Sequence, residues 1–138
     1  MKLTLKKIKD YFKSEYNWTD SISIGKIDNN QEKAICFYDS KRSLIYSPVI
    51  GGKENKSTYI KPITILLRYT KNKDSAEIKA QDIYEFFEER TFYIDSKRIF
   101  VMMNTEEPID LGTDDKNIYE YSIELDLYVE SEWIIWWN

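Results

Sequence analysis

Residues 108–129, PIDLGTDDKNIYEYSIELDLYV, decide the fold. From Ile118 on, apolar and polar side chains alternate, the pattern of a strand with one buried and one solvated face. This strand is expected to run for about twelve residues, roughly 40 Å. Its buried face should carry Tyr119, Tyr121, Ile123, Leu125, Leu127 and Val129, and its solvated face Glu120, Ser122, Glu124, Asp126 and Glu130.

The residues upstream of this strand complete a C-terminal β-hairpin. Residues 112–117 combine glycine, threonine, aspartate and asparagine, which are turn formers. Before them, residues 98–103 (RIFVMM) form a more uniformly apolar run that indicates a second strand. Two such runs joined by a polar loop predict an antiparallel pair.

Two amphipathic helices are expected, one at each side of a first group of strands. The first spans about residues 2–16, where apolar residues recur every three or four positions. The second spans about 75–90 and follows Asp74, which forms a capping-box pattern with Glu77. Strands are expected at residues 21–28, 33–38 and 58–70, and a chain reversal at 91–97.

This order of elements predicts a single α+β domain over residues 1–138. Its sheet should be mostly antiparallel or mixed, with the N-terminal and central helices packed on one face. The core should be built from ten residues: Ile8, Phe12, Ile65, Leu67, Ile83, Phe87, Val101, Ile123, Leu125 and Leu127.

Composition narrows the function classes. Apolar residues make up 42% and charged residues 32% of the chain, as in ordinary globular proteins. The lysine-broken N-terminus lacks a signal-peptide pattern, and no apolar run approaches the ~20 residues of a membrane helix. The single cysteine, Cys36, lies in the apolar run AICFY, which predicts a buried structural thiol.

Few residues offer catalytic chemistry. The sequence has no histidine, which removes the commonest general base and metal ligand. Carboxylates pair at Glu106-Glu107 and Asp114-Asp115, so a small carboxylate-dependent enzyme stays open as an alternative. Asp110, Asp114 and Asp115 could meet a calcium ion but lack the ligand spacing of an EF-hand. We expect turn roles for them, and no catalytic, cofactor or metal site.

Charge is distributed unevenly along the chain. Residues 106–132 carry ten acidic side chains and one lysine, net −9, so the remainder is net +5. Lys6, Lys9 and Lys13 share one face of the first helix. The acidic stretch is either a solvated sheet face or a surface that meets a basic patch or repels an anion.

The C-terminus is apolar without alternation. Trp133, Trp136 and Trp137 fall within five residues, a composition ill suited to water. We expect them either to fold over the core or to dock on another subunit.

The loop and strand quoted first resemble the C-terminal signature of the small minor capsid or tail terminator proteins of long-tailed phages and prophages of Gram-positive bacteria. Asn117 stands where this family commonly has glycine, and asparagine also tolerates a left-handed turn. The order of helices and strands is similar as well. The matching residues are Pro108, Leu111, Gly112, Asp114, Asp115, Lys116, Tyr119, Glu120 and Tyr121.

The resemblance implies a structural virion protein rather than an enzyme. Such proteins form a homo-oligomeric ring, commonly a hexamer, assembled in the bacterial host cytoplasm. The ring caps the tail tube, stops its polymerisation and joins the tail to the head completion or connector protein. DNA passes without specific binding, and no membrane or cofactor is involved. Another head–tail connector or adaptor is the structural alternative.

Within such a ring, the acidic strand face would lie at the channel or at a subunit interface. We expect it to line or border the channel, because carboxylates repel passing DNA. An outer solvated surface and a seam against the helix lysines of the next subunit are the alternatives. The candidate residues are Glu120, Glu124, Asp126, Glu130, Asp114, Asp115, Trp133, Trp136 and Trp137.

Overall fold

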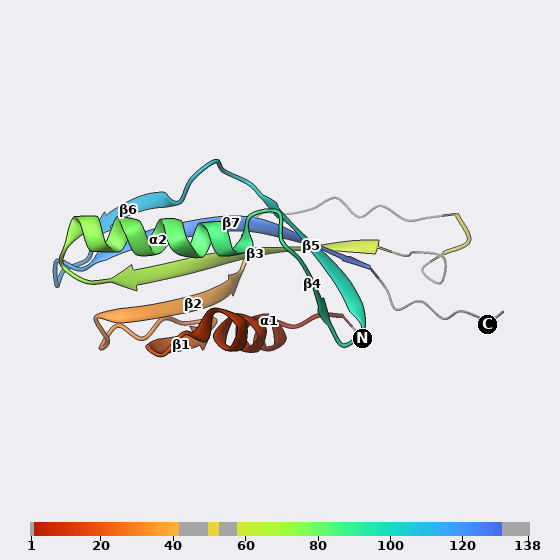
Figure 1. Ribbon diagram of the computed structural model, residues 1–138, viewed down its shortest axis with the longest axis horizontal. Helices are drawn as coiled ribbons and strands as arrows, with labels where there is room; N and C mark the ends of the chain where they lie inside the picture. The colour runs from red at the N-terminus through yellow and green to blue at the C-terminus, as the bar shows by residue number, and fades with distance from the viewer. Residues whose placement is uncertain (1, 42–49, 53–57, 131–138) are drawn as a thin grey trace.

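The computed structural model describes residues 2–41, 50–52 and 58–130 as one curled, seven-stranded sheet with two helices on one face (Figure 1). The predicted α+β class is confirmed, as is the placement of both helices. The elements are α1 (Leu5–Phe12), the π-helical turn η1 (Lys13–Asn17), β1 (Ser21–Ile24), β2 (Lys33–Asp39), β3 (Thr58–Tyr69), α2 (Lys73–Phe87), β4 (Thr91–Ile94), β5 (Lys97–Met103), β6 (Ile109–Thr113) and β7 (Tyr119–Glu130).

The long strand predicted from the alternation is the middle of the sheet. β7 is twelve residues long and pairs antiparallel with the equally long β3, from Thr58 opposite Glu130 to Arg68 opposite Glu120. The strand order is β1-β2-β3-β7-β5-β4, and β6 forms a hairpin with the first part of β7. Because β1 runs parallel to β2 and the other pairs are antiparallel, the sheet is mixed.

The helices and one sheet face enclose the core. All ten residues predicted for it are fully buried, which confirms the choice of inward face along β3, α2 and β7. Phe12 of α1 stacks on Phe87 of α2 with ring centroids 5.6 Å apart, and Phe86 meets Phe12 edge-on at 5.4 Å. Cys36 is buried as expected.

Both helices begin at other residues than the sequence pattern predicted. α1 starts at Leu5, where the Thr4 side chain accepts a hydrogen bond from the Lys7 amide. The cap of α2 is Asn72, and the prediction of Asp74 was wrong. Asn72 Oδ1 accepts from the Ser75 amide at 3.0 Å, so Asp74 lies inside the first turn.

Two short strands were missed. Residues 91–94, expected within a reversal, form β4, and the reversal itself is only Asp95 and Ser96, both with positive φ. β6 was expected as part of the polar lead-in loop. Its pairing with β7 is interrupted by a register shift near Gly112, whose φ of 83° favours glycine. Asn117 adopts the left-handed conformation expected of it, with φ 65°.

Candidate interaction surface

Both helices of the described ranges pack on one face of the sheet and leave its other face without a helix. Alternation along β7 sends Ile123, Leu125 and Leu127 into the core and the intervening side chains to the opposite side. We call this second side the open face. At the β1–β2 end a small cluster of Ile27, Ala34 and Cys36 packs on it, while the part formed by β5, β7 and the start of β3 carries exposed side chains.

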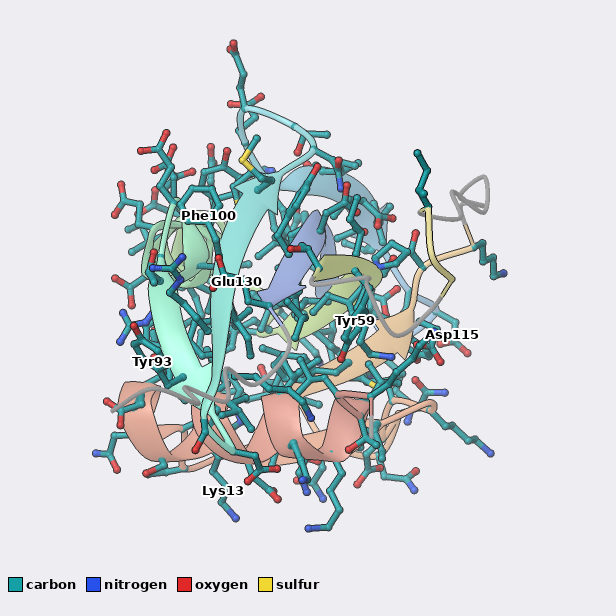
Figure 2. The ribbon with its side chains drawn as sticks, turned by 90° about the vertical axis from the view of Figure 1, so that its right-hand side faces the viewer. Lys13, Tyr59, Tyr93, Phe100, Asp115 and Glu130 are labelled. Atoms are coloured by element: carbon teal, nitrogen blue, oxygen red, sulfur yellow. The ribbon has the colours of Figure 1, made fainter. Side chains whose placement is uncertain are left out.

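Large apolar side chains gather on that exposed part. Register places Tyr128 of β7 between Ile60 of β3 and Phe100 of β5, and Met102 beside Asp126. Ile60 is 37% exposed, Phe100 38% and Met102 45%. Tyr93 on the neighbouring β4 pairs with Arg98 and is exposed as well (Figure 2). We call Ile60, Tyr93, Phe100, Met102 and Tyr128 the apolar patch.

The four acidic residues predicted on β7 lie on the same face. Glu120, Glu124, Asp126 and Glu130 are all half-buried, so the face is less solvated than the sequence pattern predicted. Glu124 and Glu130 each contact a neighbouring strand of the sheet. Glu124 Oε2 accepts from Thr64 Oγ1 at 2.6 Å, and Glu130 pairs with Arg98 at 2.5 Å, which raises the pKa of the Arg98 guanidinium.

A shallow groove continues the open face beyond the apolar patch. It has a volume of about 610 Å³, and its walls come from β2, β3, β6 and β7. Leu66 and Leu111 supply apolar walls, and Glu124 supplies a carboxylate. Apolar walls with a few polar groups suit a contact with a protein side chain.

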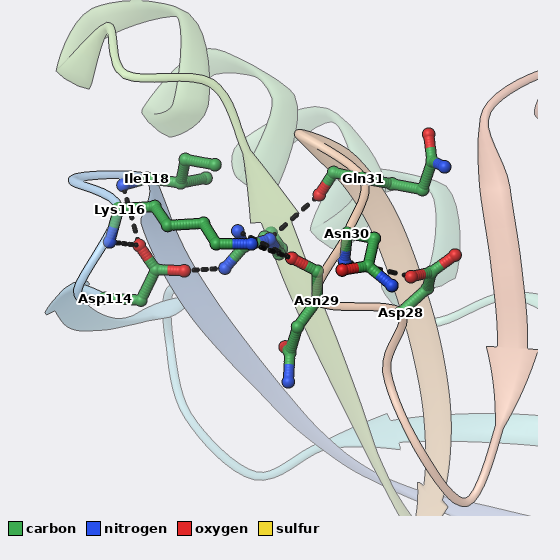
Figure 3. A network of polar contacts seen from close by, with 8 residues as sticks. Asp28, Asn29, Asn30, Gln31, Asp114, Lys116 and Ile118 are labelled. Atoms are coloured by element: carbon green, nitrogen blue, oxygen red, sulfur yellow. Dashed lines mark hydrogen bonds and ion pairs between the residues drawn. The ribbon is translucent and has the colours of Figure 1, made fainter.

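A buried arginine that the sequence analysis missed lies near the end of β3, between the β1–β2 loop and the β6–β7 turn (Figure 3). Arg68 of β3 is 1% exposed; its Nε donates to the Gln31 carbonyl at 2.9 Å and its Nη2 to the Asn29 carbonyl at 3.2 Å. Its third contact is an ion pair with Asp114. The signal in the sequence was an arginine inside the apolar run ITILLRY, facing an aspartate-rich turn.

The loop aspartates act as turn residues, as predicted. Asp114 Oδ1 accepts from the Lys116 and Ile118 amides at 2.9 and 3.0 Å. Asp115 is exposed at the tip of the turn (Figure 2). Among the residues described, no three His, Cys, Asp or Glu side chains converge as a metal site would require.

Asp110 instead forms an ion pair with Lys73, on the side of the sheet that the helices cover. Its Oδ2 meets Lys73 Nζ of α2 at 2.6 Å, and its Oδ1 accepts from the Gly112 amide at 2.7 Å. The Lys73 ammonium and this amide together lower the pKa of the Asp110 carboxyl. Lys73 also donates to Tyr121 at 2.5 Å, so the contact ties α2 to the β6–β7 hairpin.

The predicted basic face lies on α1, away from the acidic strand. Lys6 and Lys9 pair with Asp10 of the same helix at 3.0 and 3.2 Å. Lys13 extends outward from the end of α1 (Figure 2). Trp133, Trp136 and Trp137 lie outside the described residues.

These features define a structural class of protein: an α+β domain that presents a helix-free sheet face with apolar and carboxylate groups for contact. Comparison with known families gives the particular one. Residues 11–130 match the family described as bacteriophage tail terminator protein, and the chain belongs to it. No curated protein matches the chain.

The match confirms the tail terminator family that the sequence resembles. It is a family of structural phage tail proteins, not of enzymes, and its members are components of the virion tail. Of the helices in the described ranges, none is long and apolar enough to cross a membrane.

Proposed function

We propose that this protein is the ring-forming subunit that ends a phage tail. The ring, a homo-oligomer of hexameric type, caps the finished tail tube, stops its polymerisation and offers its other side to the head connector protein. Assembly takes place in the cytoplasm of the bacterial host. The observation that carries the proposal is the family match over residues 11–130.

The open face supports a contact between subunits. A ring needs two different surfaces of one subunit to fit each other. Exposed apolar side chains such as Phe100 and Met102, next to half-buried carboxylates, have the mixed character of a protein interface. A channel wall needs only carboxylates to repel DNA, so it gives no reason for the exposed apolar side chains. The composition of this face therefore favours the interface role.

The net negative charge of the chain supports the proposal that DNA passes through the ring without being bound. The net charge is −4, so the protein as a whole repels phosphates rather than holding them. Lys6, Lys7 and Lys9 already have carboxylate partners in their own chain, which reduces their pull on DNA. DNA should accordingly pass without being bound specifically.

Tube growth in the presence of the protein tests the proposal. Purified tail tube protein is allowed to polymerise with and without the chain, and tube lengths are measured by electron microscopy. We expect tubes to stop at shorter lengths, each ending in a ring, and the mass by light scattering to be a fixed multiple of the 16.6 kDa chain. Tubes of unchanged length without end rings would contradict the function.

A further inference from the structure

The apolar patch lies directly beside the point where the described chain ends. Glu130 is the last residue of β7, and it pairs with Arg98, the neighbour of Tyr93 across β4 and β5. Two residues earlier on the same strand is Tyr128, in the middle of the patch. A segment that leaves β7 therefore starts at the border of an apolar surface.

Residues 131–138, SEWIIWWN, follow β7 and suit this surface in composition. Three tryptophans and two isoleucines give the segment a large apolar area, and aromatic anchors concentrate in the buried centres of protein interfaces. Each indole Nε1–H also needs an acceptor once it is buried. The patch supplies carboxylates beside its apolar groups, with Asp126 next to Met102 and Glu124 one pair further along β7.

The reach of this segment favours another copy over its own sheet. Fully extended, eight residues span about 26 Å at about 3.3 Å per residue, enough to cross several strands of a neighbour. Return onto the same patch needs a tight reversal directly after Glu130. Ser131 is the one turn-forming residue between Glu130 and Asn138, and the stronger turn formers Gly, Pro, Asn and Asp are absent from residues 131–137.

We infer that the apolar patch of one subunit binds the C-terminal segment 131–138 of the next subunit. The contact is heterologous, because tail and patch are different surfaces, so it can repeat around a closed ring. This inference rests on the proposed ring function and names the contact that would hold the ring together.

Two variants each disrupt one side of the proposed contact. A chain that ends at Glu130 keeps the patch but lacks the segment. The full-length variant Phe100→Glu keeps the segment but places a charge in the middle of the patch, at a side chain already 38% exposed. The control is Ile78→Glu, which also replaces an exposed apolar side chain with glutamate, at a 62% exposed position on α2.

Light scattering over a range of concentrations measures the mass of each variant alone and of the two mixed. We expect the wild type and Ile78→Glu to associate alike, and each patch or tail variant alone to stay monomeric. An equimolar mixture of the two should form a pair of one chain each and no larger species, because only one tail and one patch remain intact between them.

Several results would overturn the inference. The truncated chain could associate as strongly as the wild type. The mixture of the two variants could stay monomeric. The wild type itself could be monomeric at every concentration. A truncated chain that is less stable at every concentration, with the mass of the wild type, would place the segment on its own subunit instead.

Tryptophan fluorescence gives a second measurement that does not depend on ring size. In a Trp18→Phe background the only tryptophans are those of the segment. Their emission should shift to the blue when truncated chains are added in excess, and should not shift with truncated chains that carry Phe100→Glu. The tube-growth assay keeps the two proposals apart: a truncated chain that still forms rings and stops tubes would remove this contact and leave the function standing.

Discussion

Arg68 shows how a charge inside the sheet determines the shape of one end of the molecule. Its guanidinium joins the β1–β2 loop, through the Asn29 and Gln31 carbonyls, to the β6–β7 turn, through Asp114. A buried pair of this kind is weak support for stability when compared with an apolar replacement of both partners. It becomes costly when one partner is removed alone, because the other charge stays buried without compensation.

We therefore predict that Arg68→Met destabilises the protein by about 3–5 kcal/mol in urea denaturation. The change removes the positive charge that faces the Asp114 carboxylate, which is only 16% exposed, and one donor from each of the Asn29 and Gln31 carbonyls. The matched control is Arg98→Met, which removes an exposed ion pair with Glu130 and should cost far less. Equal losses in the two variants would show that Arg68 does not hold the loops together.

Asp110 should make the stability of the folded protein depend on pH in the acid range. Lys73 and the Gly112 amide lower the pKa of its carboxyl below the ordinary value of 3.8. A carboxyl with a lowered pKa in the folded state stabilises the fold above its unfolded pKa, and that stabilisation is lost as pH falls towards the folded value. Asp110→Asn should therefore lose less stability than the wild type from about pH 5 to about pH 2. Because the pair is 45% exposed on each side, the difference should be small.

Thermal unfolding at several pH values checks this, with Asp115→Asn as the control. Asp115 is exposed on the same turn. An Asp110→Asn curve parallel to that of the wild type over the whole acid range would contradict the role given to Lys73.

Among the secondary-structure elements, α2 has two candidate N-cap residues close together, Asn72 and Asp74, and the structure shows which of them caps the helix. Asn72 accepts from the Ser75 amide, whereas Asp74 lies within the first turn. Asn72→Ala should cost about 1 kcal/mol, the usual loss for an N-cap. Asp74→Ala should cost only a few tenths, through the helix dipole. Chemical denaturation measures both, and a larger loss for Asp74→Ala would restore the capping box that the sequence predicted.

This element also shows what sequence reasoning could reach. The periodicity of β3, α2 and β7 was long enough to assign their inward faces, and Ile65, Ile83 and Leu125 are buried accordingly. The cap of α2 was missed because Asn72 and Asp74 are both good cap residues and only tertiary structure decides between them. β4 was missed because four residues are too few for a pattern, although Phe92 is buried in the core.

The candidate surface was reached only in part. Alternation correctly put Glu120, Glu124, Asp126 and Glu130 on one side of β7. It could not show that Phe100 and Ile60 lie beside them, since that depends on the register of β5 and β3 against β7. A face predicted as acidic and solvated therefore became a mixed face with half-buried carboxylates.

At the scale of the whole molecule, the two helices and the open face lie on opposite sides of one curled sheet (Figure 1). The helix side bears the paired lysines of α1, and the open face bears the carboxylates of β7. A subunit with two unlike sides can contact its neighbours in a directed way, as a ring requires. Reversing charges on the open face tests whether this side of the subunit contacts the neighbouring subunit.

The double reversal Glu124→Lys and Asp126→Lys makes that test. If the open face is an interface, ring assembly should be lost while circular dichroism shows an intact fold, because two half-buried carboxylates are replaced by strongly hydrated ammonium groups. If it lines the channel, rings should form and retain DNA at low salt, since lysines hold phosphates by releasing counterions. The control is Glu77→Lys with Glu85→Lys, which changes the net charge equally at exposed positions on α2. We expect the Glu124→Lys, Asp126→Lys variant to lose ring assembly. Rings of normal mass in this variant would contradict the interface role. Such rings would then be compared with the control for DNA retention: greater retention would indicate a channel wall, and equal retention an outer surface.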